Sequence, residues 1–205
     1  MMAEEEVISS HVSDDEGDEK IQYKAPPEKS LSDIVQQDQE DESLRKYKET
    51  LLGASSSAGT PIIIDHSDDR RVLVRQLALV VEGRDDIVLD LAQGDLNKLK
   101  DSPFTIKEGI TYRIRIDFQV QREIVTGLKY IQRTHRKGIQ VDKMTHMVGS
   151  YAPMEAMQSY TTPPEDAPSG MLSRGHYTVK SLFTDDDNHE HLKWDWSFDI
   201  KKDWD

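Results

Sequence analysis

Apolar residues recur at every second position through much of the chain from residue 61 onward, which is the pattern of half-buried β-strands. The alternation is most regular at residues 112–120 and 194–200, where large apolar side chains alternate with charged or polar ones. Shorter runs predict further strands near residues 73–81, 87–91, 104–106, 128–134, 144–151 and 175–183. Only residues 94–99 have the pattern of a short helix between strands. About eight short strands separated by turn residues predict an all-β fold, an antiparallel β-sandwich of the immunoglobulin type.

The segment before residue 61 has a different apolar period, that of two short helices. The first has apolar residues at helical spacing within 31–35, behind Ser30 as its capping residue. The second begins at Asp41 or Ser43, either of which can cap it. Its apolar stripe consists of Leu44, Tyr47, Leu51 and Leu52. Such a stripe either packs on the chain's own domain or meets a partner surface and orders on contact.

These patterns divide the chain into three parts. Residues 1–28 are rich in Glu, Asp and Ser, and we expect a disordered acidic tail because so few large apolar groups cannot offset the chain entropy. Residues 29–60 form a helical arm that ends in a linker of Ala, Ser and Gly, a composition typical of flexible segments. Residues 61–205 form the sandwich domain, which is long enough to bury a sizeable core.

The net charge of −13 is concentrated before the sandwich domain. Residues 1–60 hold 15 acidic and 6 basic residues, a net charge of −9, and the remainder holds 24 acidic and 20 basic residues. Such a chain is a poor binder of nucleic acid, because that binding depends on Lys and Arg displacing counterions from phosphates. The sequence has neither the order of a signal peptide nor an apolar run long enough to span a bilayer. We therefore expect a cytosolic protein with no nucleic-acid partner and no stable membrane insertion.

A search for catalytic and metal-binding motifs finds none. The phosphate-binding, dinucleotide-binding, serine-hydrolase and zinc-protease motifs are all absent. The absence of cysteine excludes disulfides and thiolate metal sites. His189 and His191 lie two apart without a third ligand at a recognisable spacing, and the acidic run 185–188 fits no calcium-loop register. We therefore expect no cofactor, no metal and no enzymatic activity.

Large aromatic residues are the remaining unusual feature. Trp194, Trp196 and Phe198 lie on one face of a single predicted strand. They either fill the core between the two sheets or hold the sheets apart and leave room for an apolar ligand.

Several segments are similar in sequence to those of a known family. In chain order they are residues 41–48 (DESLRKYK), 51–53 (LLG), 122–125 (REIV), 127–132 (GLKYIQ), 147–151 (MVGSY), 167–172 (APSGML), 183–187 (FTDDD) and 200–204 (IKKDW). Together they resemble the Rho GDP-dissociation inhibitors, and they run in order through nearly the whole chain.

The resemblance implies a regulator with two working parts. A helical arm holds the switch regions of a small GTPase of the Rho, Rac or Cdc type and favours its GDP-bound state. An immunoglobulin-like domain accepts the geranylgeranyl tail between its sheets, so that the complex is extracted from membranes and stays in the cytosol. The family pattern also implies a monomer that forms a heterodimer with the GTPase.

Carried over to this sequence, the resemblance implies three groups of site residues. The switch-binding group is Asp41, Ser43, Tyr47, Leu51 and Leu52. The tail-pocket group is Phe104, Ile124, Tyr151, Val179, Trp194 and Trp196. The acidic patch for the basic segment before the prenylated cysteine is Glu165, Asp166, Asp186 and Asp187. His146 departs from the family pattern, which has Tyr at this position.

A different class of protein remains as an alternative. A general lipid-binding β-sandwich carrier would recognise lipidated proteins without an arm specific for GTPases. An adhesion-type immunoglobulin domain is a weaker alternative, because the chain has no cysteine and no signal peptide. Removal of residues 1–60 separates the first two, because a general carrier would keep its affinity for cargo.

Overall fold

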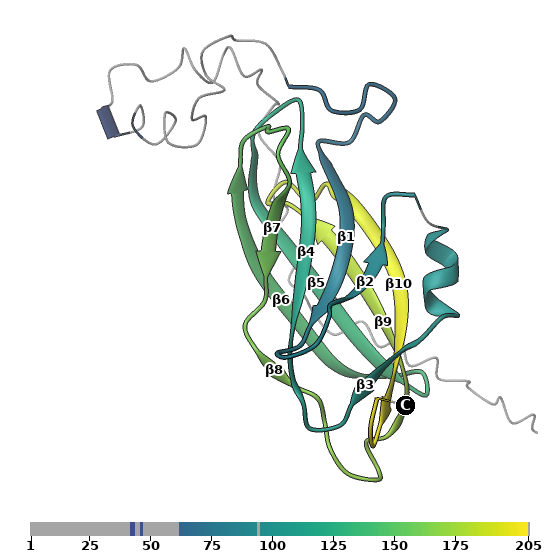
Figure 1. The fold of residues 1–205 in the computed structure, drawn as a ribbon. Coiled ribbons are helices and arrows are strands. Elements are labelled where there is room, and N and C mark those ends of the chain that lie inside the picture. Colours follow the sequence, from purple (N-terminus) through teal and green to yellow (C-terminus); the bar gives the residue numbers. More distant parts are fainter. Residues whose placement is uncertain (1–41, 44–45, 47–61, 94, 205) are drawn as a thin grey trace, which may run out of the picture.

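The computed structural model describes residues 42–43, 46, 62–93 and 95–204, and from residue 62 onward the chain forms two β-sheets packed face to face (Figure 1). The first sheet has the order β2–β1–β4–β7, with β8 added to β4. Its strands are β1 (Val72–Val80), β2 (Ile87–Asp90), β4 (Thr111–Val120), β7 (Gln158–Thr161) and β8 (Glu165–Asp166). The second sheet has the order β3–β10–β9–β5–β6. Its strands are β3 (Phe104–Lys107), β5 (Val125–Arg136), β6 (Ile139–Tyr151), β9 (Gly175–Thr184) and β10 (Glu190–Lys201).

The prediction of an all-β, immunoglobulin-like sandwich is confirmed. Neighbouring strands are antiparallel except β3 and β10, which pair in parallel. The predicted short helix is a 3-10 helix, Leu96–Lys100, with Asp95 as its N-cap. The sequence did not predict β7 and β8, because they are short and lack a run of alternating large apolar residues. It also placed the start of β6 five residues late, because the first five residues of β6 are exposed.

The core lies between the sheets and is built from the alternating residues of β4 and β10. Ile114, Ile116 and Phe118 are fully buried from the first sheet. Trp194 and Trp196 are buried from the second. Each such side chain contributes about 1.5–3 kcal/mol on burial. The pattern that predicted the strands is therefore also the pattern that holds the two layers together.

The two ends of the sandwich differ in what they are made of. At the entry end, the chain arrives through residues 62–71 and meets the end of β4, the start of β5 and the β9–β10 turn. At the far end lie the start of β4, β8, the β5–β6 turn and the start of β9 (Figure 1). Because β5 has 12 residues at about 3.3 Å each, the two ends are roughly 40 Å apart.

Candidate functional site

A cleft of about 550 Å³ opens between the two sheets at the far end. Its volume is within the range of about 300–1,000 Å³ that is usual for ligand sites. The first sheet and the segment after it supply Tyr112, Glu165, Asp166 and Pro168. The second sheet supplies Gln132, Thr134, Arg136, Val141, Asp142, Met144, Tyr177 and Phe198. The cleft is therefore a gap between the layers and not a groove on one of them.

Stacked aromatic rings connect the cleft with the core behind it. The rings of Tyr177 and Phe198 are parallel within 3°, with centroids 5.1 Å apart. Phe198 in turn lies 5.7 Å from Trp196, and Trp196 stacks on Phe104 at 5.3 Å. An apolar chain that entered the cleft would meet the rings of Tyr177 and Phe198, with Trp196 and Phe104 behind them, and such an aromatic lining favours apolar ligands.

Carboxylates from both sheets line the mouth of the cleft. Asp142 on β6 is exposed, and Glu165 and Asp166 on β8 lie across from it. The Tyr112 hydroxyl donates a hydrogen bond to Glu165 at 3.2 Å, and Nε2 of His146 lies 3.8 Å from the same carboxylate. Burial raises the pKa of Glu165 and lowers that of His146. Arg136 also lines the cleft, so three carboxylates stand against one guanidinium there, and this excess of acidic groups suits a cationic ligand segment.

Most polar groups deeper inside the sandwich have hydrogen-bond partners. The Tyr130 hydroxyl donates to Gln132 at 2.8 Å and lies 3.0 Å from Ser181. The indole N–H of Trp196 donates to Ser181 at 2.9 Å. Within the part of the chain that the structure describes, the buried indole nitrogen of Trp194 has no partner. Because Tyr130, Gln132, Ser181 and Trp196 satisfy one another, this part of the interior favours an apolar ligand over a polar one.

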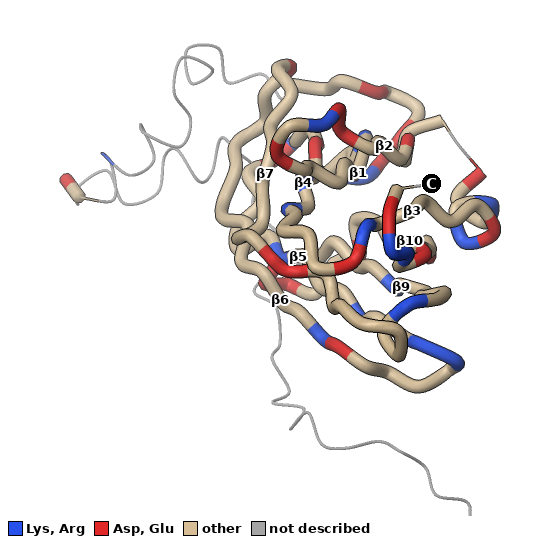
Figure 2. Tube along the Cα trace, turned by 60° about the horizontal axis from the view of Figure 1, so that its bottom comes forward, with Lys and Arg blue, Asp and Glu red and all other residues tan. Residues whose placement is uncertain are grey.

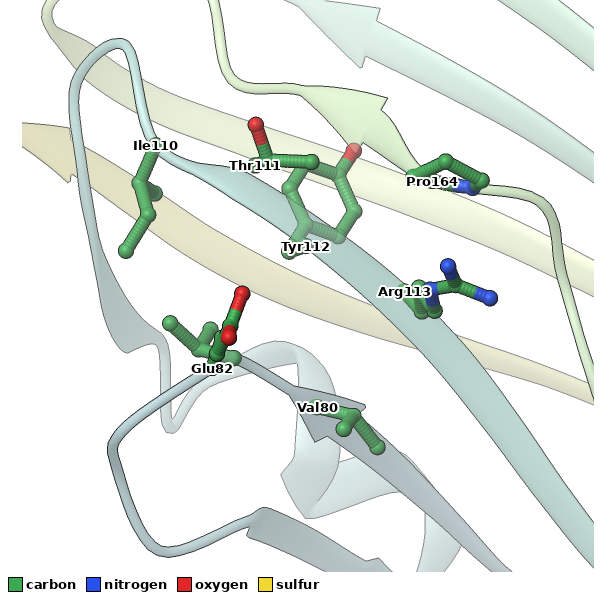
Figure 3. A pocket seen from close by; sticks show the side chains of 8 residues that line it. Val80, Glu82, Ile110, Thr111, Tyr112, Arg113 and Pro164 are labelled. Atoms are coloured by element: carbon green, nitrogen blue, oxygen red, sulfur yellow. The ribbon is translucent and has the colours of Figure 1, made fainter.

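A second pocket of similar volume, about 570 Å³, lies beside the cleft at the end of β1 and the start of β4 (Figure 3). Tyr112 lines both. Glu82 and Arg113 lie on the walls of the second pocket, and no residue of the ring stack lines it. The cleft is therefore the better candidate for an apolar ligand.

The structure brings four of the six predicted tail-pocket residues together. Val179, Trp194 and Trp196 are 0%, 2% and 1% exposed, and Phe104 packs against Trp196. Val179 and Trp196 are also opposite each other in the β9–β10 pair. All four lie in the second sheet, among or next to the ring stack behind the cleft floor.

Ile124 and Tyr151 lie at the entry end, away from the cleft. Val125, the residue after Ile124, pairs with Tyr151 across β5 and β6. The Tyr151 ring meets Phe118 edge-on at 5.0 Å. The sequence could not separate these two from the other tail-pocket residues, because the resemblance carries no information about depth along the sandwich.

The four predicted acidic residues do not form one patch. Glu165 and Asp166 line the cleft, whereas Asp186 and Asp187 lie in the β9–β10 turn at the entry end. Asp186 pairs with Lys129 at 2.6 Å. It also lies directly above Gly127, which has a φ of 62° and no space for a Cβ atom. Sequence reasoning missed Asp142, because the start of β6 was placed too late for it to be counted in the strand.

Little of the arm lies within the described residues. Glu42, Ser43 and Lys46 are helical, as predicted for the second helix, and all three are exposed. Glu42 and Lys46 form an ion pair at 3.0 Å with i,i+4 spacing. Asp41, Tyr47, Leu51, Leu52 and the predicted disordered tail 1–28 lie outside the described residues.

Comparison with known proteins decides the family. A sequence profile described as "RHO protein GDP dissociation inhibitor" matches residues 9–203. The chain belongs to the Rho GDP-dissociation inhibitor family. It is 46% identical to Rho GDP-dissociation inhibitor 1 of Homo sapiens, over 99% of each chain. It is 42% identical to a probable rho GDP-dissociation inhibitor of Caenorhabditis elegans, over 95% of this chain and 100% of that one.

A more distant similarity concerns the fold. A Niemann-Pick type C2 protein from the Japanese carpenter ant has a TM-score of 0.40 and 8% identity, and the match covers 63% of this chain and 93% of that chain. This similarity is too weak to support an inference. The family description names an inhibitor of nucleotide dissociation, which is a regulator and not an enzyme. Among the residues that the structure describes, no helix is long and apolar enough to cross a membrane.

Proposed function

We propose that this protein binds prenylated, GDP-bound Rho-family GTPases and holds the geranylgeranyl tail in the cleft between the sheets. The observation that carries the proposal is the cleft itself, which has an acidic mouth and a floor of stacked rings. The tail enters past Tyr177 and Phe198 and extends toward Phe104, Val179, Trp194 and Trp196. The basic segment before the prenylated cysteine meets Asp142, Glu165 and Asp166.

Burial of the tail in the cleft does not by itself account for extraction of a GTPase from a membrane. A tail of about 20 carbons gains on the order of 10–15 kcal/mol when it leaves water, at about 0.8 kcal/mol per CH₂. A bilayer offers a comparable gain, so tail burial alone does not extract a GTPase from a membrane. Contacts with the protein part of the GTPase must supply the difference.

The arm is the proposed source of that difference. Asp41, Ser43, Tyr47, Leu51 and Leu52 meet the switch surface and hold the GDP-bound state, so that GDP release slows. In this division of the chain, residues 29–60 act on the GTPase and residues 61–205 act on its tail. The complex is a heterodimer that keeps the GTPase in the cytosol.

A pair of neighbouring substitutions tests the cleft. Met144 on β6 lines the cleft, whereas Thr145, the next residue, faces outward from the same strand. Met144→Trp should fill the cleft and lower the affinity for prenylated, GDP-bound GTPase at least about tenfold, because a tail that loses two CH₂ contacts loses about 1.6 kcal/mol. Thr145→Trp is the matched control. The measurement is binding of fluorescent GDP-loaded GTPase, prenylated and unprenylated, beside a thermal melt.

Two results would contradict the proposal. Unchanged affinity of Met144→Trp for prenylated GTPase would exclude the cleft as the tail site. An equal loss for the prenylated and unprenylated forms would show that the substitution acts on the GTPase body and not on the tail.

A further inference from the structure

Exposed apolar side chains gather on two turns at the far end. Ile139, Met171 and Leu172 are 71%, 81% and 88% exposed, the highest values among the large apolar residues that the structure describes. With Val141 and the basic residues Arg136 and Lys137, they line a groove of about 410 Å³. We call these six residues the tip patch. Single exposed apolar residues are common on protein surfaces, whereas a contiguous group indicates a binding surface.

Hydrogen bonds fasten the turn that carries Met171 and Leu172. The N–H of Gly170 donates to Glu108 at 2.9 Å, and Arg174 binds the same carboxylate through two nitrogens at 2.9 and 2.6 Å. The Tyr177 hydroxyl donates to the carbonyl of Ser173 at 2.7 Å. The exposure of Met171 and Leu172 therefore belongs to a fixed turn.

The second turn of the tip patch carries positive charge. Lys137 and Gly138 form the β5–β6 turn, both with positive φ. The Arg136 guanidinium donates to the carbonyl of Arg174 at 2.7 Å and lies 5.3 Å from the centre of the Tyr177 ring. Within the described part of the chain, neither Arg136 nor Lys137 forms an ion pair.

A row of basic residues lies on the outer face of the second sheet behind the tip patch. Arg133 on β5 is directly opposite Lys143 on β6 and Lys180 on β9. All three are exposed, and like charges directly opposite one another destabilise a sheet. None of the three forms an ion pair within residues 62–93 and 95–204. Figure 2 shows basic residues along this layer and at the β5–β6 turn.

We propose that the tip patch and the basic row form a contact surface for an anionic lipid bilayer. Apolar side chains on a fixed edge enter the interface between headgroups and acyl chains, while Lys and Arg attract anionic headgroups. The chain as a whole has a net charge of −13, but the three adjacent cations of the basic row face outward and would attract a negatively charged partner. The carboxylates of Asp142, Glu165 and Asp166 line the cleft and not the groove.

The position of the tip patch links this surface to the cleft. Arg136 and Val141 line both the groove and the cleft. A bilayer on the tip patch would therefore lie beside the cleft, on the side formed by Arg136 and Val141, and a lipid tail would pass between them without crossing bulk water. This link rests on the proposed function, whereas bilayer contact itself does not.

The test uses the full chain without GTPase and vesicles of phosphatidylcholine with or without phosphatidylserine, at low salt. Binding should require phosphatidylserine and weaken as salt rises, because screening acts over about 10 Å at 0.1 M. Met171→Asp with Leu172→Asp should reduce binding at least about tenfold. Arg133→Gln with Lys143→Gln should reduce it about fivefold for each charge removed. The matched control is Met154→Asp with Met157→Asp, two exposed methionines between β6 and β7.

Several outcomes would overturn the proposal. One is equal binding to vesicles with and without phosphatidylserine. Another is an equal loss of vesicle binding in the control variant, Met154→Asp with Met157→Asp. A third is unchanged vesicle binding by the tip variant, Met171→Asp with Leu172→Asp. Loss of a dimer in the tip variant, seen by ultracentrifugation without lipid, would assign the patch to a second copy of this chain. The tip variant should keep its affinity for prenylated GTPase in solution and extract it more slowly from vesicles. Failure of the cleft proposal would instead appear with Met144→Trp, in solution.

Discussion

The two ends of the sandwich differ in where their polar side chains lie: buried within the domain at one end, and around an open cleft at the other. At the entry end, the amide of Gln121 accepts hydrogen bonds from the N–H groups of Ile64 and Asp65 and donates to the carbonyls of Asp68 and Arg70. At the far end, carboxylates line an open cleft and apolar side chains face the surrounding water. At the entry end, one buried side chain thus fastens the segment that leads into β1, whereas the far end contains an open cleft.

Asp185 is a second example of a satisfied group at the entry end. It is buried, and it accepts hydrogen bonds from the N–H groups of Asp187 and His189 at 3.0 and 2.9 Å. Ring nitrogens of His189 and His191 lie 3.1 and 3.0 Å from its other oxygen. One buried side chain therefore contacts three later residues, in the β9–β10 turn and at the start of β10. A firmly held entry segment and an open cleft can coexist in one core because they lie at opposite ends.

The largest expected effect comes from one substitution made at both ends. Gln121 and Gln132 are 0% and 2% exposed. Gln121 makes four hydrogen bonds to backbone groups, whereas Gln132 accepts one from Tyr130. Gln121→Ala should cost about 2–4 kcal/mol and lower Tm by roughly 10 °C, because buried backbone groups lose their partners. Gln132→Ala should cost about 1 kcal/mol. Urea unfolding of both variants measures the difference, and equal costs would remove the contrast between the ends.

An intermediate effect is expected from acidification. Burial by itself raises the pKa of Asp185, but hydrogen bonds from His191 and the His189 backbone outweigh it and bring the pKa to about 2. Because the folded pKa lies below the usual value of 3.8, its contribution to stability is complete above pH 4 and is lost as pH falls toward 2. The loss should be about 2 kcal/mol.

Unfolding free energies measured between pH 5 and pH 2 test this. Asp185→Asn should be less stable at pH 5 and should show a shallower decline with falling pH. Asp101→Asn, at an exposed position after the 3-10 helix, should decline in parallel with the parent. If Asp185→Asn and the parent had the same slope, the carboxylate would not be the group that titrates.

The smallest effect is expected at the far end. Burial raises the pKa of Glu165, so its charged form is disfavoured in the folded protein and stability falls as pH rises through that window. Glu165→Gln should therefore leave stability at pH 7 unchanged or raise it by less than about 0.5 kcal/mol. Affinity for the basic tail of a GTPase should fall about two- to fivefold, as for an exposed ion pair. A decrease of more than about 1 kcal/mol in the free energy of unfolding would show instead that Glu165 stabilises the fold.

The sequence predicted the layers of the sandwich, but not which of its predicted site residues lie near one another. Alternation at residues 112–120 and 194–200 reports which side chains face inward, and those residues are the core. It does not report how deep along the sandwich a residue lies. Trp196 and Tyr151 therefore belonged to one predicted pocket although Trp196 lies behind the cleft and Tyr151 at the entry end. Depth depends on strand register, and the register of β5 with β6 contains three irregularities that no residue pattern reveals.

Asp142 shows the same limit for charge. Its neighbours on β6 are exposed, so the segment lacks the apolar alternation that marks a strand. Only the pairing of Asp142 with Thr134 turns its carboxylate toward the cleft. The pattern of residues within β6 cannot predict this pairing, because the pairing depends on how two strands align.

The parallel pair of β3 and β10 has a consequence for biogenesis. Phe104 pairs with Phe198 across this junction, so a contact between residues almost a hundred positions apart closes the second sheet. Contacts of such separation form slowly, because the intervening chain must first be ordered. On the ribosome, β3 cannot pair until β10 has emerged. The ring stack behind the cleft is therefore completed only after β10 has been made, and the proposed lipid site does not exist before that point.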